Sequence, residues 1–165
     1  MREQAKRERI LHYLESNSRI DLDELAIMLD MKKEDLLSEI FAMEQENIIC
    51  GYPTLINWEN AGYEMVTAMI EVSVTPQRDN GFDKIAERVY NYDEVTSVYL
   101  ISGGFDLMVI LEGRTLREVS SFVTDKLSTI EGVLNTKTNF ILKKYKDHGS
   151  IMEQKKRDER ILMTP

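Results

Sequence analysis

The pattern with the clearest binding chemistry is a glycine pair followed closely by an aspartate: Gly103, Gly104 and Asp106. Glycines let a ligand approach the backbone and expose N–H groups to an anion, while a carboxylate pairs with an ammonium group. Such a site suits a small molecule that carries both charges. The alternative is a diglycine hairpin turn in which Asp106 bonds its own loop. Thr136 and Thr138 could add hydroxyl groups from one strand face, although threonine is also a common strand former.

A second group of residues could contact nucleic acid. Lys32, Lys33 and Ser38 lie at or within a helix-like segment, and cations and hydroxyls bind phosphate. The same segment is acidic, since residues 30–46 contain six acidic and two basic residues. A carboxylate that faces phosphate opposes binding, although acids are favoured at a helix N-terminus and can accept a hydrogen bond from cytosine. The alternative is that these three residues belong to an ordinary solvated helix face.

The sequence offers little chemistry for catalysis. The two histidines, His12 and His148, are far apart, and no Cys/His cluster has metal-ligand spacing. No nucleophile elbow, phosphate-binding loop or dinucleotide fingerprint occurs. We therefore expect no enzyme activity, no metal and no cofactor.

Composition and charge narrow the class of protein further. A formal net charge of −8 argues against a protein that simply coats nucleic acid. No apolar run approaches the roughly 20 residues of a membrane span, and the charged N-terminus lacks the apolar segment of a signal peptide. A single cysteine excludes an intramolecular disulfide. These features predict a cytoplasmic protein with no membrane partner.

The elements that must hold the basic residues are three helices. Apolar spacing predicts helices over residues 3–15, 22–29 and 33–46, with Asp21 as the N-cap of the second helix. The short turn between the second and third helices is typical of a helix-turn-helix. Residues 48–52 then favour a short strand that pairs back with residues 55–57 to form a wing. We expect a winged helix-turn-helix domain over residues 1–57 and a connector over 58–64.

The glycine–aspartate pattern lies in a second domain, over residues 65–145, which is expected to alternate strands and helices. Gly103-Gly104 should supply the positive φ values of a tight hairpin turn, Thr115 with Glu118 should cap a helix, and Gly132 should end it. Strands are expected at 65–75, 95–102, 105–111 and 133–142, and helices at 81–91 and from 115 to 131. The order βαββαβ predicts a ferredoxin-like (ACT-like) α+β fold.

Two further expectations concern the surface of this domain and the tail. With both helices on one face of the sheet, the other face is uncovered, and apolar strand residues such as Tyr99 and Leu107–Leu111 need a partner there. We infer a homodimer through the sheets. Residues 146–165 are expected to form a C-terminal extension, either a short hairpin or an additional edge strand.

Several segments together resemble the Lrp/AsnC family of transcription regulators. The segment ILHYLESNSRIDLDELAIML is similar to the first two helices of that family, and Asn47–Tyr52 resembles its G-V-I-x-G-Y strand. Gly103-x-x-Asp106, Gly132-Val133 and Thr136-x-Thr138 follow in the family's order. Each segment is weak alone, but the order and spacing over about residues 7–142 are fairly specific.

The resemblance implies double-stranded DNA as a partner of the N-terminal domain and an amino acid as the effector of the C-terminal domain. It also implies dimers that assemble further, into tetramers or octamers. Proteins of this family bind effectors between dimers near the Gly-x-x-Asp turn, which makes Gly103, Gly104, Asp106, Thr136 and Thr138 the candidate ligand residues.

The third helix departs from the family, whose members usually place Arg or Lys at the positions matching Ser38 and Glu39. Two hypotheses follow. In one, the chain is a sequence-specific DNA-binding regulator that responds to an amino acid through assembly. In the other, it is an effector-binding and assembly protein with weak or no DNA affinity that acts through protein partners.

Overall fold

A computed structural model describes residues 2–75 and 81–153 of the chain. The chain divides into two compact units, Met1–Leu55 and Ile56–Pro165. Within the described residues, no helix is long and apolar enough to cross a membrane.

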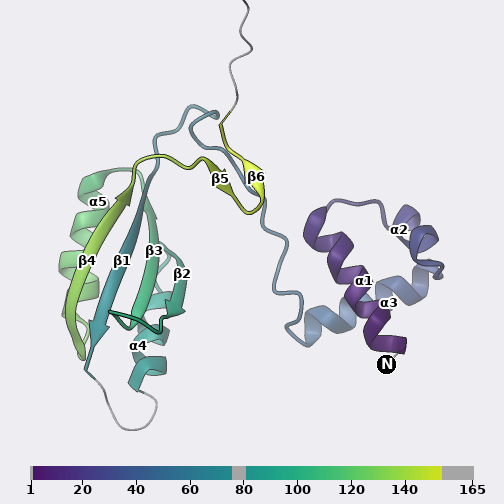
Figure 1. Cartoon of the computed structure of the whole chain (residues 1–165), viewed down its shortest axis with the longest axis horizontal. Helices are drawn as coiled ribbons and strands as arrows, with labels where there is room; N and C mark the ends of the chain where they lie inside the picture. Colours follow the sequence, from purple (N-terminus) through teal and green to yellow (C-terminus); the bar gives the residue numbers. More distant parts are fainter. Residues whose placement is uncertain (1, 76–80, 154–165) are drawn as a thin grey trace, which may run out of the picture. The chain divides into compact units, whose positions relative to one another are not determined.

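The first unit is built from three helices, α1 (Arg2–Ser16), α2 (Leu22–Leu29) and α3 (Lys33–Gln45) (Figure 1). Their apolar residues recur at helical spacing and meet in one core, which explains why each short helix is stable in this unit. The buried members are Ile10, Leu14, Leu25, Ala26, Leu29, Leu36, Ile40 and Met43. The three predicted helices are confirmed.

Local chemistry sets the ends of α2. The side chain of Asp21 accepts hydrogen bonds from the backbone N–H groups of Asp23 and Glu24, at 2.8 and 3.1 Å. These bonds satisfy two donors that the first turn leaves unpaired. Asp30 ends the helix in a left-handed conformation, with φ 53°. The predicted N-cap is therefore confirmed, and the sharp turn into α3 follows from Asp30.

The predicted wing is wrong. No strand forms between residues 46 and 65, all of which the structure describes. The backbone N–H groups of Ile48 and Ile49 both donate to the carbonyl of Met43, because Asn47 adopts a φ of 54° and turns the chain back onto the end of α3. These amides close the helix and are not available to a strand partner.

The second unit contains a four-stranded sheet with strand order β2-β3-β1-β4. Its strands are β1 (Val66–Val74), β2 (Val95–Leu100), β3 (Leu107–Gly113) and β4 (Val133–Ile141), and its helices are α4 (Gly81–Tyr90) and α5 (Leu116–Ser121). Every neighbouring pair is antiparallel. Both helices lie on the same face of the sheet (Figure 1). The predicted βαββαβ order and the α+β ferredoxin-like class are confirmed.

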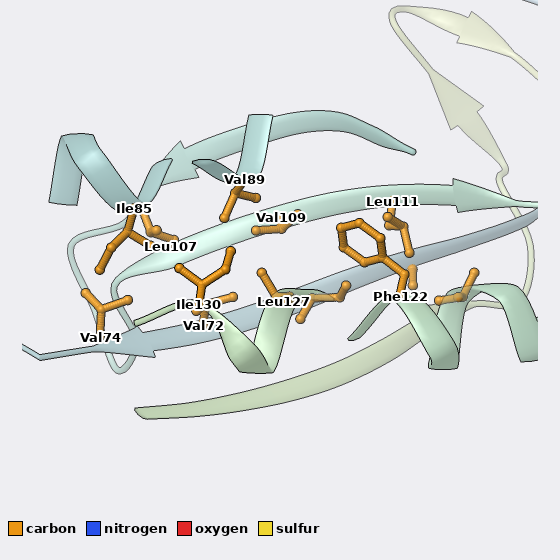
Figure 2. Close-up of a cluster of buried hydrophobic side chains, with 13 residues drawn as sticks. Val72, Val74, Ile85, Val89, Leu107, Val109, Leu111, Phe122, Leu127 and Ile130 are labelled. Carbon is orange, nitrogen blue, oxygen red and sulfur yellow. The ribbon is translucent and has the colours of Figure 1, made fainter. Parts of the chain in front are cut away.

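One core lies between the sheet and the two helices. Alternate residues of β1 and β3 point into it, as the period of two in a strand requires. Figure 2 shows these side chains meeting those of the helices. The buried strand residues are Ala68, Ile70, Val72, Val74, Leu107, Val109 and Leu111, and those from the helical segments are Ile85, Val89, Val119, Phe122, Leu127 and Ile130.

The second helical segment changes its geometry along its length. Thr115 caps α5 by accepting from the N–H of Glu118, and the Glu118 side chain accepts in turn from the N–H of Arg114. The segment then widens into a π-helical turn, η1 (Phe122–Lys126), and tightens into a 3-10 turn, η2 (Leu127–Thr129). Gly132, with φ 96°, leads into β4. The predicted cap at Thr115 is confirmed. The predicted cap at Gly132 is wrong in its position, because the segment ends at Thr129 with Ile130 as an extended C-cap, and the left-handed Gly132 follows two residues later.

The predicted diglycine hairpin turn is wrong in its geometry. Neither Gly103 nor Gly104 has a positive φ. The strands end earlier and start later than predicted, and Ile101 donates its N–H to the carbonyl of Asp106 at 2.8 Å to close a longer loop. A six-residue loop needs no left-handed residue at its centre, whereas a two-residue hairpin turn does.

The uncovered face of the sheet is of mixed polarity. On the β4 side, Glu71 accepts hydrogen bonds from Lys137 and Asn139, at 3.1 and 2.9 Å. These bonds lower the pKa of the Glu71 carboxyl, with Lys137 as the main cause. On the β3 side, Met108 and Ile110 are half-buried. The predicted apolar surface is therefore interrupted by a polar group of residues on the β4 side.

The described part of the tail forms a small hairpin. Strands β5 (Lys146–Asp147) and β6 (Ser150–Ile151) pair as a separate two-stranded sheet. His148 and Gly149 have φ values of 41° and 80°, as a tight hairpin turn requires. Of the predicted extension, residues 154–165 lie outside the described residues.

Candidate functional site

The predicted ligand residues lie at one end of the sheet, around the C-terminal end of β1. Asp106 donates its N–H to the carbonyl of Val72, and its Oδ2 atom accepts from the N–H of Val74 at 2.8 Å. The carboxylate therefore holds the loop to β1 rather than bonding its own loop. Among residues 2–75 and 81–153, no donor reaches its Oδ1 atom. That oxygen can accept from a ligand.

The two glycines leave open space beside the loop. A side chain at Gly104 would meet no atom within 4 Å, and one at Gly103 would touch only the Cγ2 atom of Ile101, at 3.6 Å. Both residues are exposed. The backbone of the loop is therefore accessible to a small molecule close to Asp106.

The threonines of β4 approach the same place from the other side of β1. Val72 pairs with Leu107 on one side and with Thr136 on the other. Thr138 pairs with Ile70, two residues farther along the strand. The Thr136 and Ser128 hydroxyl oxygens are 3.4 Å apart. The fold therefore brings Gly103, Gly104, Asp106 and Thr136 to one end of the sheet, while Thr138 lies a step away.

The candidate DNA residues lie at the start and on the outer side of α3. Lys32, Lys33 and Ser38 are all exposed. Lys33 is already paired, because its Nζ atom donates to Oδ2 of Asp23 at 2.8 Å, and this bond raises the pKa of the ammonium group. Lys32, by contrast, carries a charge for which the described residues supply no ion-pair partner. Its ammonium group is the more available of the two for phosphate.

The acidic character of α3 is partly neutralised by α1. The guanidinium of Arg7 donates to Glu39 at 2.9 Å and to Glu46 at 2.7 Å. The pKa of Arg7 is raised by these bonds, and the pKa of the Glu46 carboxyl is lowered. Glu39, at one of the positions where the third helix departs from the family, does not face outward as a free charge. Its carboxylate is turned toward α1 and is paired with Arg7.

Two apolar residues of α3 lie outside the core and were not among the predicted site residues. Leu37 and Phe41 are exposed, with relative exposures of 42% and 62%. Apolar side chains in a major groove contact the methyl group of thymine. Their exposure was a detectable signal, since the buried positions Leu36, Ile40 and Met43 leave residues 37 and 41 outside the core stripe.

Comparison with known proteins identifies both halves of the chain. The profile of the Lrp/AsnC ligand binding domain matches residues 67–151. YugG of Bacillus subtilis (strain 168), named as an uncharacterized HTH-type transcriptional regulator, is 45% identical over 161 residues, which cover 97% of each chain. The proline dehydrogenase transcriptional activator of Rhodobacter capsulatus is 31% identical over 128 residues, 78% of this chain and 82% of that protein.

Solved structures share the fold. The transcriptional regulator NMB0573 of Neisseria meningitidis, in complex with L-Met, is 25% identical, with a TM-score of 0.68, covering 86% of this chain and 91% of that one. The leucine response regulatory protein LrpA of Mycobacterium tuberculosis has a TM-score of 0.74 at 19% identity, covering 90% and 98%. The second likeness shows the fold alone.

Proposed function

The chain belongs to the Lrp/AsnC family of transcription regulators, and we propose that it is a sequence-specific DNA-binding regulator whose action responds to an amino acid. The observation that carries the proposal is the 45% identity to an HTH-type regulator over 97% of the chain, an alignment too long to omit the three-helix unit. We infer a cytoplasmic regulator that is not an enzyme, because its relatives are named transcription regulators.

DNA binding is assigned to α3 and the turn before it. Lys32 supplies a charge for phosphate, Ser38 a hydroxyl, and Phe41 an apolar contact. Lys33 adds a second phosphate contact when its ammonium group leaves Asp23 and binds a DNA phosphate instead. The pairing of Arg7 with two carboxylates supports this assignment, because it reduces the negative charge on α3 that would repel DNA.

Effector binding is assigned to the loop of residues 101–106 and the start of β4. The Oδ1 atom of Asp106 can accept from an ammonium group, the exposed amides at Gly103 and Gly104 can donate to a carboxylate, and Thr136 adds a hydroxyl. This arrangement suits the part that all amino acids share. The L-Met bound to the Neisseria relative is consistent with that chemistry.

Oligomer assembly is the proposed link between the two activities. A homodimer through the uncovered sheet face would cover Met108 and Ile110, and two-fold symmetry suits a palindromic operator. Dimers would assemble into tetramers or octamers. An amino acid that binds one assembly better than another shifts the equilibrium between them, and with it the affinity for DNA.

A gel-shift titration on the protein's own promoter, with and without a panel of amino acids, tests the proposal. We expect specific binding that at least one amino acid changes, and a marked loss of affinity when Lys32 and Lys33 are both replaced by Ala. The matched control is Lys84→Ala, an exposed lysine on α4. Absence of specific binding at physiological salt, with every amino acid, would favour the assembly protein that acts through protein partners.

A further inference from the structure

A cleft of about 860 Å³ lies at the end of the sheet opposite the loop of residues 101–106. It opens between the start of β1, the residues just before β2, the end of β3 and the helical segment that begins with α5. Val66 pairs with Gly113 at this end and Val72 with Leu107 at the other. Six residues of strand, roughly 20 Å, therefore separate the cleft from the proposed effector loop.

The floor of the cleft is apolar. Met65, Leu111, Val119 and Phe122 line it, and three of the four are buried core residues. Figure 2 shows Leu111 beside Phe122 at this end of the core. Small-molecule sites share this combination of an apolar floor with polar groups beside it, although they usually have fewer charged groups.

Most of the charged groups around the cleft are already paired within the protein. Glu94 accepts from Lys126, which lowers the pKa of the Glu94 carboxyl. Glu112 accepts from Lys144 at 3.0 Å, and Glu118 accepts from the N–H of Arg114 at 2.8 Å. These carboxylates are held by donors of the fold, so they are not the groups that a ligand would meet first.

Three charged groups of the cleft remain unpaired. The carboxylates of Asp93 and Asp125 and the guanidinium of Arg114 line it, and all three residues are exposed. Within the described ranges, 2–75 and 81–153, no hydrogen bond or ion pair engages these side-chain groups. The unpaired groups therefore comprise two anions and one cation over an apolar floor.

The helical segment is irregular where it forms the wall of the cleft. In the π-helical turn η1, the N–H of Leu127 donates to the carbonyl of Phe122, five residues earlier. Phe122, Asp125 and Lys126 of this turn all line the cleft. Lys126 is fixed over the rings of Tyr92 and Phe122, at 5.2 and 5.5 Å from the ring centroids. Such turns are uncommon and occur frequently at functional sites.

We propose that this cleft is a second ligand site and that it binds a dibasic amino acid, such as lysine or arginine. Arg114 takes the ligand carboxylate, Asp93 and Asp125 take its two cationic groups, and the apolar floor contacts its methylene chain. The charges are complementary in sign, because the cleft keeps an excess of negative charge and the ligand carries one excess positive charge. The site is distinct from the effector loop around Asp106, and the proposal stands whether or not that loop binds an amino acid.

Calorimetric titration of the full chain with L-lysine, L-arginine, L-leucine and cadaverine tests the proposal. We expect the two dibasic amino acids to bind and leucine not to bind at this site. Replacing Asp93 and Asp125 together by Asn should weaken lysine binding by about tenfold or more, because two charge-assisted contacts are lost. Asp83→Asn, an exposed carboxylate on α4 outside the cleft, is the matched control and should bind lysine as the native chain does.

Arg114→Gln separates the roles of the charges. It should weaken lysine binding by about tenfold and leave the binding of cadaverine, which is lysine without its carboxylate, nearly unchanged. If neither lysine nor arginine binds at concentrations up to about 10 mM, the proposal is overturned, because a dissociation constant above that value means that no site is formed for these ligands. A second outcome also overturns the proposal. If Asp106→Asn abolishes lysine binding and the Asp93/Asp125 double change leaves it intact, the ligand occupies the effector loop. The variants are folded if their thermal midpoints match that of Asp83→Asn.

Discussion

Arg7 compensates part of the negative charge of the acidic third helix. Its guanidinium bonds both Glu39 and Glu46, so two of the six carboxylates in residues 30–46 face α1. Lys33 shows the reverse case, because a cation expected to meet DNA is held by Asp23. At this scale the count of charges matters less than the partner of each charge.

Replacing Asp23 by Asn should strengthen DNA binding. The change releases the ammonium group of Lys33 from its ion pair and removes a nearby negative charge, so we expect roughly a twofold to fivefold gain in affinity. Lys33→Ala should make the slope of log K against log salt concentration shallower by about one, because one phosphate contact is lost. Gel shifts at several salt concentrations measure both. An unchanged affinity for Asp23→Asn would mean that Lys33 does not reach the phosphates.

Replacing Asp106 by Ala should destabilise the second unit. The N–H of Val74 loses its acceptor, and a part-buried donor left without a partner costs about 1–2 kcal/mol. Urea unfolding followed by circular dichroism measures the loss, with Asp83→Ala as the control. A loss no larger than that of the control would show that water replaces the carboxylate at no cost. Asp106 therefore has a structural role in addition to the proposed contact with the effector.

Elements in this chain are stabilised by a few contacts between segments that are distant in the sequence. Arg7 joins α1 to the end of α3, and Asn57 of the connector donates to the carbonyl of Met152 at 2.8 Å. Lys144, just before β5, bonds Glu112 at the end of β3. The last two contacts hold the connector and the C-terminal hairpin to the sheet of the second unit.

Acid should weaken the contact between α1 and α3. The pKa of the Glu46 carboxyl is lowered below its usual value of 4.5 by Arg7, so its contribution to stability is complete above about pH 4.5 and is lost as the pH falls through the lower folded-state value. Glu46→Gln should therefore reduce the melting temperature more at pH 7 than at pH 3. Calorimetric scans of both chains across this range measure the difference. Glu15→Gln, on the surface of α1, is the control, and an equal difference at both pH values would contradict the prediction.

Replacing Asn57 by Ala should loosen the C-terminal hairpin. The carbonyl of Met152 loses its donor, which costs about 1 kcal/mol locally. Backbone amides of β5 and β6 should then exchange with deuterium roughly fivefold faster, as mass spectrometry of peptides from this region can measure. Asn91→Ala, which removes a side-chain bond at the end of α4, is the control. Unchanged exchange in β5 and β6 would show that the hairpin is held by its other contacts.

At the scale of the whole molecule, the two units have separate cores, and the second unit leaves one sheet face uncovered. The apolar part of that face, with Met108 and Ile110, lies on the β3 side, while Glu71, Lys137 and Asn139 bond one another on the β4 side. A dimer through this face would combine an apolar contact with a polar one. Polar contacts in an interface fix the register of the partners more than they add affinity.

Replacing Ile110 by Asp should dissociate the proposed dimer. A charge placed in the apolar part of the face would have to be buried without a partner, which is costly enough to favour the monomer. Light scattering after size exclusion should show the mass fall from that of an oligomer toward that of one chain. Leu116→Asp, on the exposed side of α5, is the control for added charge. An oligomer that survives Ile110→Asp would place the interface elsewhere.

Much of the architecture follows from local chemistry and was predictable. The caps at Asp21 and Thr115 act through hydrogen bonds two or three residues along the chain, and Gly132 supplies a left-handed φ at its own position. The periods of apolar residues, 3.6 in helices and 2 in strands, depend only on backbone geometry. Neither the caps nor the apolar periods depend on residues that are distant in the sequence. The order of elements and the fold class could therefore be predicted from the sequence.

Tertiary structure alone decided the rest. Arg7 and Glu39 are 32 residues apart, and Asp106 reaches Val74 across the same interval, so no local rule pairs them. The predicted wing does not form, because the N–H groups of Ile48 and Ile49 donate to the carbonyl of Met43 and are not available to a strand. The cleft between β3 and α5 has walls from four segments, and only the folded chain decides which of its charges remain unpaired. Sequence determines what each segment can form by itself, whereas the partners of its charged and polar groups depend on which distant segments the fold brings beside it.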